Sequence, residues 1–184
     1  MVDFFYKIMF LLGEIKKILF IGKYSAGKNF RLYATGGIIG DRSKIIIGNN
    51  VELEGWLISD GGKITVHDNT FIHERTVVRS MGNVEIGEYC DIGPDCYIQD
   101  HNSRSLDYIH RRGYTKTGRL EKDVLNAPVK IGNDVWMGRR ASVLKGVTIG
   151  DRAIVATCAV VTKDVPDESI AAGNPARIVK RIKE

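Results

Sequence analysis

Bulky aliphatic side chains recur at every sixth position over much of the chain, and this is the dominant pattern in the sequence. Near the C-terminus these positions are Ile131, Met137, Val143, Ile149, Val155 and Val161. A small or β-branched residue stands four positions after each of them, at Val135, Ala141, Val147, Ala153, Ala159 and Val165. The same spacing occurs upstream within three shorter sets, which are Ile47 and Leu53, then Val66, Ile72 and Val78, and then Ile86, Ile92 and Ile98. A period of six is not that of a helix or of simple alternation, so it indicates a repeated structural unit.

This period predicts an all-β fold in which short strands wind around a three-sided prism. Three hexapeptides close one coil, and successive coils stack at the strand spacing of about 4.8 Å. The inward aliphatics should then form three ladders: Ile86 with Ile131 and Ile149, Ile92 with Met137 and Val155, and Ile98 with Val143 and Val161. A β-sandwich with regular turns is the alternative, but the long run of regular spacing favours a parallel β-helix.

Glycine often follows the aliphatic directly, at Gly132, Gly138 and Gly150. We expect these glycines to sit at corners where the backbone needs a positive φ.

Three segments follow from the extent of the repeat. Residues 31–175 are assigned to the β-helix domain. Its period breaks between Ile98 and Ile131 and resumes without loss of face order, which indicates an inserted loop at 102–128. Residues 176–184 are expected to form a short C-terminal helix that caps the solenoid, because the ends of a solenoid need covering.

The N-terminal segment, residues 1–30, lacks the repeat. Its apolar residues follow a spacing of three or four, which predicts an amphipathic helix; they are Phe4, Phe5, Ile8, Leu11, Leu12, Ile15, Ile18 and Leu19. One interpretation is that residues 1–22 lie on an anionic membrane surface, and the other is that the helix caps the open end of the β-helix. A cytoplasmic, membrane-peripheral location accords with the first.

Composition narrows the function classes. The chain has 184 residues, a hydrophobic content of 43% and a formal charge of +5. The positive charge gathers at the two ends rather than along the body, which argues against nucleic acid. The three cysteines, Cys90, Cys96 and Cys158, include no CxxC pair and fall at or beside the inward small position. We therefore expect a reducing compartment, no disulfide and no exposed nucleophilic thiol.

Several motifs near the C-terminus go beyond the bare repeat. The segments VKIGNDVWMGRRASVLKGVTIGDRAIVATCAVVTKDV (129–165) and SIAAGNPARIVKR (169–181) resemble the hexapeptide-repeat acyltransferases. They are most similar to the branch that contains maltose, galactoside and polysaccharide O-acetyltransferases. The resemblance implies a left-handed β-helix, a homotrimer, acetyl-CoA as the donor and an active site between subunits beside the inserted loop.

The resemblance also implies residue roles. His101, in CYIQDHNSRSLD at the root of the insert, matches the family's general base, and a neutral imidazole suits removal of a hydroxyl proton. The backbone N–H of Arg139 matches the oxyanion donor. The acetyl-CoA contacts implied are Gly138, Arg139, Thr157, Lys163, Arg177 and Lys180. Candidate acceptor contacts are His73, Arg104, Asp107 and Arg111.

The function predicted is acetyl transfer from acetyl-CoA to a sugar hydroxyl, in surface polysaccharide or glycolipid biosynthesis. The transfer is expected to be direct, without an acyl-enzyme. The alternatives are an N-acetyltransferase of an amino sugar or sugar nucleotide and a non-catalytic β-helix scaffold. No metal is expected, because His67 and His73 lie on different faces of the predicted prism and cannot share an ion.

Overall fold

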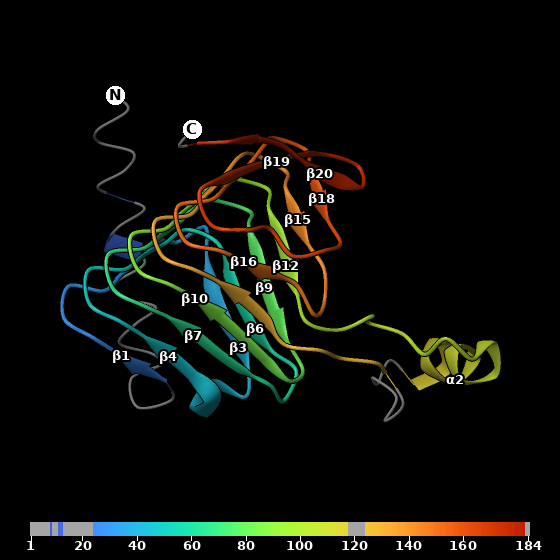
Figure 1. Ribbon diagram of the computed structural model, residues 1–184. Coiled ribbons are helices and arrows are strands. Elements are labelled where there is room, and N and C mark those ends of the chain that lie inside the picture. Colours follow the sequence, from blue (N-terminus) through green and yellow to red (C-terminus); the bar gives the residue numbers. More distant parts are fainter. Residues whose placement is uncertain (1–7, 9–10, 13–23, 118–123, 183–184) are drawn as a thin grey trace.

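The computed structural model describes residues 8, 11–12, 24–117 and 124–182 (Figure 1). Its strands form three sheets around a common core. The first sheet contains β1 (Ser25–Ala26), β4 (Ile45–Ile47), β7 (Lys63–Val66), β10 (Asn83–Ile86), β13 (Val129–Ile131) and β16 (Thr148–Ile149). The second contains β2 (Arg31–Leu32), β5 (Glu52–Leu53), β8 (Phe71–Ile72), β11 (Asp91–Ile92), β14 (Trp136–Met137), β17 (Ile154–Val155), β19 (Ser169–Gly173) and β20 (Ala176–Arg181). The third contains β3 (Gly37–Gly40), β6 (Trp56–Ser59), β9 (Val77–Ser80), β12 (Tyr97–Gln99), β15 (Ser142–Val143) and β18 (Val160–Val161).

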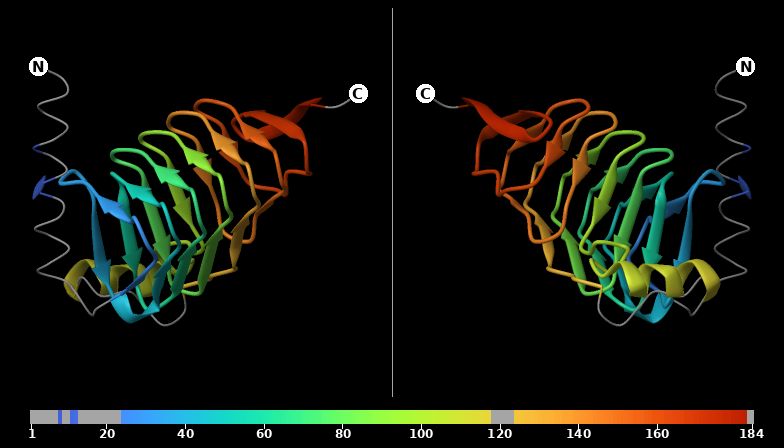
Figure 2. Two further views of the ribbon diagram at one scale, coloured as in Figure 1. Left: turned by 90° about the vertical axis from the view of Figure 1, so that its left-hand side faces the viewer. Right: turned by 90° about the vertical axis from the view of Figure 1, so that its right-hand side faces the viewer.

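The fold is a left-handed parallel β-helix, as predicted. The chain visits the three sheets in turn, and the coils stack along one axis from the N-terminal end to β19 and β20 (Figure 2). The paired residues reproduce the predicted ladders: Ile86 pairs with Ile131 and Ile131 with Ile149, and the other two ladders follow the same register. These side chains are fully buried, so the interior is a continuous aliphatic column.

The β-helix begins earlier than residue 31. The strand β1 (Ser25–Ala26) pairs in parallel with β4, so the boundary predicted at residue 30 is wrong by about one strand. Ala26 stands opposite Ile47, where the period would call for a bulky aliphatic, so this first strand was not visible in the sequence pattern. The predicted N-terminal helix falls mostly outside the described residues; Ile8, Leu11 and Leu12 are described, and their side chains are exposed.

The repeat glycines serve close packing rather than a positive φ. Gly132, Gly138 and Gly150 are not among the residues with positive φ. A Cβ atom on Gly138 would lie 2.6 Å from the backbone nitrogen of Thr157 in the next coil. The positive φ values fall two residues later, for example at Asp134 and Arg140. The predicted reason for these glycines was therefore wrong: the coils approach too closely at this position for any side chain.

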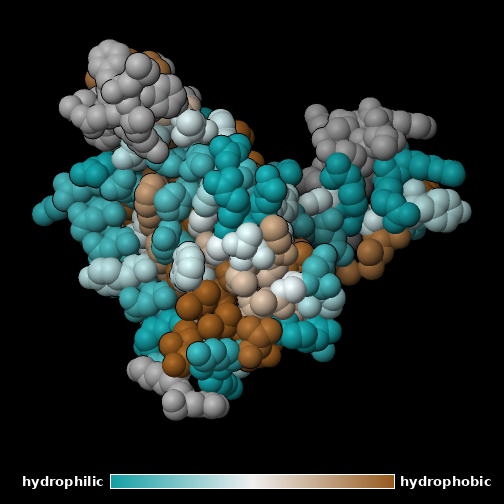
Figure 3. Space-filling view, turned by 90° about the horizontal axis from the view of Figure 1, so that it is seen from above, coloured by the Kyte–Doolittle hydropathy of each residue, from teal (hydrophilic) through white to brown (hydrophobic). Residues whose placement is uncertain are grey.

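The C-terminal segment is a strand, not the predicted helix. The antiparallel pair of β19 and β20 closes that end of the stack. Exposed apolar side chains on and after β20 are Ile178, Val179 and Ile182. Seen from above, the surface is mainly hydrophilic with hydrophobic residues gathered in one area (Figure 3). The C-terminal end of the solenoid is thus covered by a β-hairpin that extends the second sheet, and not by the predicted helix.

The insert leaves the coil after β12 and rejoins it at β13. It carries the helix α2 (Tyr108–Thr117), which stands away from the body of the β-helix (Figure 1). A short 3-10 turn, η1 (Arg42–Lys44), is the other helical element with described bounds. Among the described residues, no helix combines the length and the apolar composition that crossing a bilayer demands.

Candidate active site

His101 lies where the inserted loop departs from the coil. It lies two residues after the end of β12 and forms an isolated antiparallel bridge with Asn126, which belongs to the returning end of the loop. Both ends of the insert are therefore tied together at this residue. The His101 side chain is 0% exposed, so the loop and the neighbouring coils cover the imidazole.

The two ring nitrogens of His101 have different surroundings. Nδ1 accepts a hydrogen bond from the backbone N–H of Ser103 at 2.9 Å. Nε2 is buried, finds no hydrogen-bond partner in the described part of the chain, and lies 3.6 Å from Oδ2 of Asp60. Because Nδ1 acts as an acceptor, the neutral ring carries its proton on Nε2, directed at the Asp60 carboxylate. A buried polar nitrogen without a partner is costly and is typical of a functional site.

Asp60 is held by a cation of its own. It follows β6, and both of its carboxylate oxygens contact the guanidinium of Arg79 on β9 (Nη2 to Oδ1, 3.1 Å). Arg79 pairs in register with Gln99 on β12, so Asp60, Arg79 and His101 come from three successive coils at one corner of the prism. Asp60 and Arg79 were not predicted from the sequence. The only signal was that Gly61 and Gly62, Gly82 and the insert all interrupt the repeat at this same corner.

Burial lowers the pKa of His101 below its ordinary value. The negative charges of Asp100 and Asp60 oppose that shift, while the positive charge of Arg79 adds to it. Desolvation is the largest of these effects, because a charged imidazolium loses its hydration in a covered site. The ring is therefore neutral at pH 7, as a proton acceptor must be.

This shift predicts how stability responds to acid. In the unfolded chain His101 binds a proton near pH 6.5, whereas in the folded chain it does so only at lower pH. Acidification below about pH 6.5 therefore favours the unfolded state. The free energy of unfolding of the wild type, minus that of His101→Gln, should fall as the pH drops from 8 to 5.5 in urea titrations. A flat profile for His101→Gln would contradict the assigned shift.

Asp100 anchors the loop root from the opposite side of the backbone. It is fully buried, and its carboxylate accepts hydrogen bonds from Oγ of Ser80 at 2.7 Å and from the backbone N–H groups of Met81 and Gly82, both at 2.8 Å. Neighbouring residues on an extended strand point to opposite faces, and Asp100 accordingly faces the preceding coil, not the imidazole. It fixes the backbone from which His101 projects.

A cavity of about 250 Å³ adjoins His101 at this corner. Its lining residues are Gln99, His101, Asn102, Leu144, Lys145 and Thr162. Lys163, one of the predicted acetyl-CoA contacts, is exposed directly after Thr162. The cavity therefore extends from the predicted base to Thr162, the residue next to one of the predicted phosphate-binding cations.

The other predicted donor-binding residues lie elsewhere on the chain. Gly138, Arg139 and Thr157 occupy the corner between the second and third sheets, at the opposite end of the third-sheet strands from His101. Arg177 and Lys180 are exposed on β20. The backbone N–H of Arg139 donates no hydrogen bond within the described residues, and its side chain contacts Asp95 at 3.4 Å. One chain thus does not bring the predicted oxyanion donor to the predicted base.

Three of the candidate acceptor residues act on the loop itself. Oδ1 of Asp107 accepts the N–H of Ile109, which caps the start of α2. The Arg111 guanidinium donates to the carbonyls of Ser105 and Leu106, and the Arg104 guanidinium donates to the carbonyl of Ser103. The fourth, His73, lies at the same corner as Gly138 and not beside His101.

The cysteines divide into two kinds. Cys90 and Cys96 are buried, as predicted for inward filler, and burial raises the pKa of each thiol to about 11. Cys158 is exposed, so the expectation that no thiol reaches the surface was wrong. It takes the positive-φ position of its corner, which points its side chain away from the core.

The chain is a β-helix of hexapeptide repeats with a buried histidine at the root of its insert. Comparison with known proteins shows which proteins share these features. The family model of the bacterial transferase hexapeptide, with six repeats, matches residues 128–163. A Mycobacterium tuberculosis protein named "Probable acetyltransferase" is 29% identical over 161 residues, which are 86% of this chain and 50% of that protein. The chain spans about half the length of this curated relative.

Two solved structures share the fold. A hexapeptide-repeat acetyltransferase from Vibrio cholerae, complexed with acetyl-CoA, is 25% identical with a TM-score of 0.60, and the match covers 93% of this chain and 78% of that one. An N-acyltransferase from Bacillus cereus, complexed with a dTDP-amino sugar and CoA, is 22% identical with a TM-score of 0.74 over 92% and 89% of the two chains. In its repeat and in its fold the chain is therefore similar to hexapeptide-repeat acyltransferases.

Proposed function

We propose that this protein is an acetyl-CoA-dependent O-acetyltransferase that acetylates a sugar hydroxyl in surface polysaccharide or glycolipid biosynthesis. The observation that carries the proposal is the His101 imidazole: buried, held neutral, next to Asp60 and bordering a cavity at the root of the insert. A scaffold protein gains nothing from a buried ring nitrogen that has no partner.

The residues present fit an acyl-CoA donor. Nδ1 of His101, which is unprotonated in the neutral ring, and the backbone N–H of Arg139, which makes no hydrogen bond among the described residues, are the two polar groups that acyl transfer needs. Lys163, Arg177 and Lys180 are exposed cations suited to phosphates. The V. cholerae relative was solved with acetyl-CoA, which supports the same donor here. When bound, acetyl-CoA supplies a thioester carbonyl that accepts the sugar oxygen and releases the CoA thiolate.

His101 moves the proton. It accepts the hydroxyl proton as the sugar oxygen attacks, and it returns that proton to the departing thiolate. The Asp60 carboxylate, 3.6 Å from Nε2, stabilises the imidazolium formed in between. The backbone N–H of Ser103 donates to Nδ1 of His101, and the ring is covered. The acceptor hydroxyl must therefore take the place of the Ser103 N–H at Nδ1, and this requires residues 102–105 to move.

The Arg139 N–H is assigned to the carbonyl oxygen of the thioester, whose negative charge grows during attack. His101 and Arg139 lie at opposite ends of the third-sheet strands in one chain, so the site needs a second copy. We therefore propose a homotrimer in which Arg139 of one copy faces His101 of its neighbour. Cytoplasmic location, where acetyl-CoA is available, and peripheral membrane contact through residues 1–22 are part of the same proposal.

An acceptor screen tests this function. The full chain is incubated with acetyl-CoA and a panel of hydroxyl sugars, amino sugars and sugar nucleotides, and the products are identified by mass spectrometry. We expect an ester on a hydroxyl sugar. Amide products alone would support the alternative, since the B. cereus protein of the same fold is an N-acyltransferase. Transfer to no member of the panel, with no hydrolysis of acetyl-CoA, would overturn the enzyme proposal in favour of a scaffold.

A further inference from the structure

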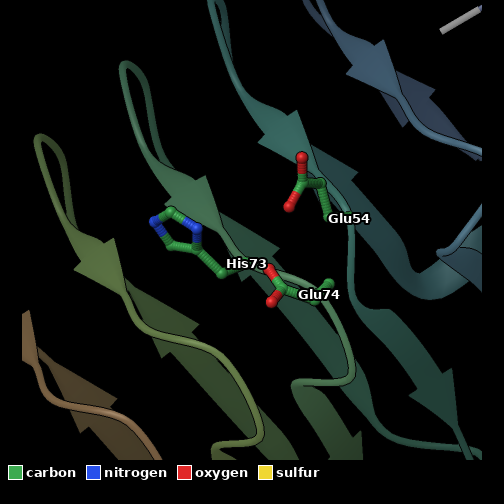
Figure 4. A group of neighbouring side chains, drawn as sticks. All are labelled: Glu54, His73 and Glu74. Atoms are coloured by element: carbon green, nitrogen blue, oxygen red, sulfur yellow. The ribbon is translucent and has the colours of Figure 1, made fainter. Parts of the chain in front are cut away.

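A second group of ionisable side chains lies at the corner between the second and third sheets, away from His101. Glu54 directly follows β5, and His73 and Glu74 directly follow β8 in the next coil. One potential ligand atom from each of the three lies within 4.8 Å of the others. Figure 4 shows the two carboxylates and one ring nitrogen of His73 facing a common space.

The His73 ring is fixed so that one nitrogen points into this space. Its Nε2 bonds Oδ1 of Asp91, on the coil beyond, at 2.8 Å, and the ring stacks on Phe71 with centroids 3.8 Å apart. Because the carboxylate holds the proton on Nε2, the neutral ring presents an unprotonated Nδ1 to Glu54 and Glu74. A histidine that donates its other N–H to a carboxylate is the usual arrangement of a metal ligand.

The negative charge in the group is only partly balanced by protein cations. Glu54 is only 7% exposed, and no lysine or arginine forms an ion pair with it in the described ranges. Arg75 contacts Glu74 at 3.5 Å but makes its short contacts with Asp95, at 2.6 and 3.0 Å. Burial raises the pKa of Glu54, and the charge of Glu74 adds to this shift. A buried carboxylate beside a second carboxylate calls for a proton or a cation.

We propose that Glu54, His73 and Glu74 form a binding site for a divalent transition-metal ion, with Zn²⁺ as the ion that the donor set fits. One imidazole nitrogen and two carboxylate oxygens are ligands that Zn²⁺ accepts, and three protein ligands leave a fourth position for water. Tetrahedral donors on zinc lie roughly 3.4 Å apart, so small side-chain rotations close the observed spacing. The ion would link two successive coils and neutralise the buried charge. It would lie at the same corner of the prism as Arg139, which is proposed to face His101 of a neighbouring copy.

The chain offers a matched control one corner away. Nε2 of His67 contacts Oε1 of Glu85 on the next coil at 3.0 Å, so this pair repeats the His73–Asp91 pair six residues earlier in the chain. Among the described residues, His67 is not part of a group of three potential metal ligands. Substitution of His67 therefore removes a histidine–carboxylate contact without touching the proposed ligands.

The test is a Zn²⁺ titration of the full chain after removal of metal with a chelator, in a Cys158→Ser background because that thiol is exposed. We expect one saturable Zn²⁺ per chain and a melting temperature that rises with Zn²⁺. Glu54→Gln and His73→Gln should each weaken binding by at least about 100-fold, and Asp91→Asn by 10–100-fold. His67→Gln should bind as the parent does. Circular dichroism confirms that each variant is folded, and Asp91→Asn, at an exposed residue, keeps the test available if Glu54→Gln fails to fold.

Three results would overturn the proposal. These are the absence of saturable Zn²⁺ binding in the parent, unchanged binding in folded Glu54→Gln and His73→Gln, or an equal loss in His67→Gln. Stronger binding of Mg²⁺ than of Zn²⁺ would overturn the assigned class of ion.

Discussion

Replacing His101 with alanine is expected to lower the kcat of acetyl transfer by 10²–10⁴-fold. The sugar hydroxyl is a poor nucleophile until it loses its proton, and His101 is the buried, neutral imidazole at the loop root. The KM for acetyl-CoA should change little, because the ring acts on the acceptor proton and not on the donor's binding groups. Steady-state kinetics with the acceptor identified in the screen would measure both constants.

The matched control for this change is His110→Ala. His110 lies in the same insert, on the exposed surface of α2, and its replacement should leave kcat within a few-fold of the wild type. Full transfer by a folded His101→Ala protein would remove His101 from the role of base. An equal loss in both variants would indicate that the insert as a whole, rather than one imidazole, had been disturbed.

Arg139→Pro is expected to lower kcat by 10²–10³-fold, whereas Arg139→Ala should have a small effect. Proline removes the backbone N–H that we assign to the oxyanion, and alanine keeps it. The fold should accept the change, because Pro94 holds the equivalent place one coil earlier. Ile92 pairs with Met137, so Pro94 corresponds to Arg139. The next residues, Asp95 and Arg140, both have positive φ values, of 60° and 58°. Parallel kinetics on the two variants, with circular dichroism to verify the fold, would measure the difference.

A mixture of chains extends this test to the proposed site between subunits. A His101→Ala chain and an Arg139→Pro chain, unfolded together and refolded, would form mixed trimers in which some sites receive an intact His101 from one copy and an intact Arg139 from the other. Activity should then exceed that of either variant alone. Equal activity of Arg139→Pro and Arg139→Ala would contradict the oxyanion role. No recovery in mixed oligomers would contradict the shared site.

Much of the fold was predictable because one constraint repeats along the chain. Every inward position must fill the same narrow prism, so Ile131, Met137 and their equivalents recur at a spacing that can be counted. The insert was visible for the same reason, since a break in a strict period is easy to locate. The C-terminal hairpin was missed because residues 176–181 obey no such constraint: their side chains are largely exposed, and their pattern is compatible with helix or strand.

The site was predictable only in part. His101 could be found from its place at the break and from the resemblance of the surrounding motif. Its partners could not, because Asp60 and Arg79 lie 41 and 22 residues earlier in the chain and reach the ring through coil stacking. The same holds for Glu54, which lies 19 residues before His73 and reaches it through coil stacking.

The sequence by itself thus determined the coiled architecture and the position of the insert, because both follow from a spacing along one chain. The residue on which catalysis is proposed to depend followed from its place at that break together with the resemblance of the surrounding motif. Tertiary structure alone decided which charges meet. The corners differ in length, so the number of residues between two stacked positions differs from coil to coil. Which side chains meet across two coils therefore depends on the lengths of all the corners between them. The resulting register makes the His101 imidazole neutral and buried, and it brings Glu54 next to His73 and Glu74.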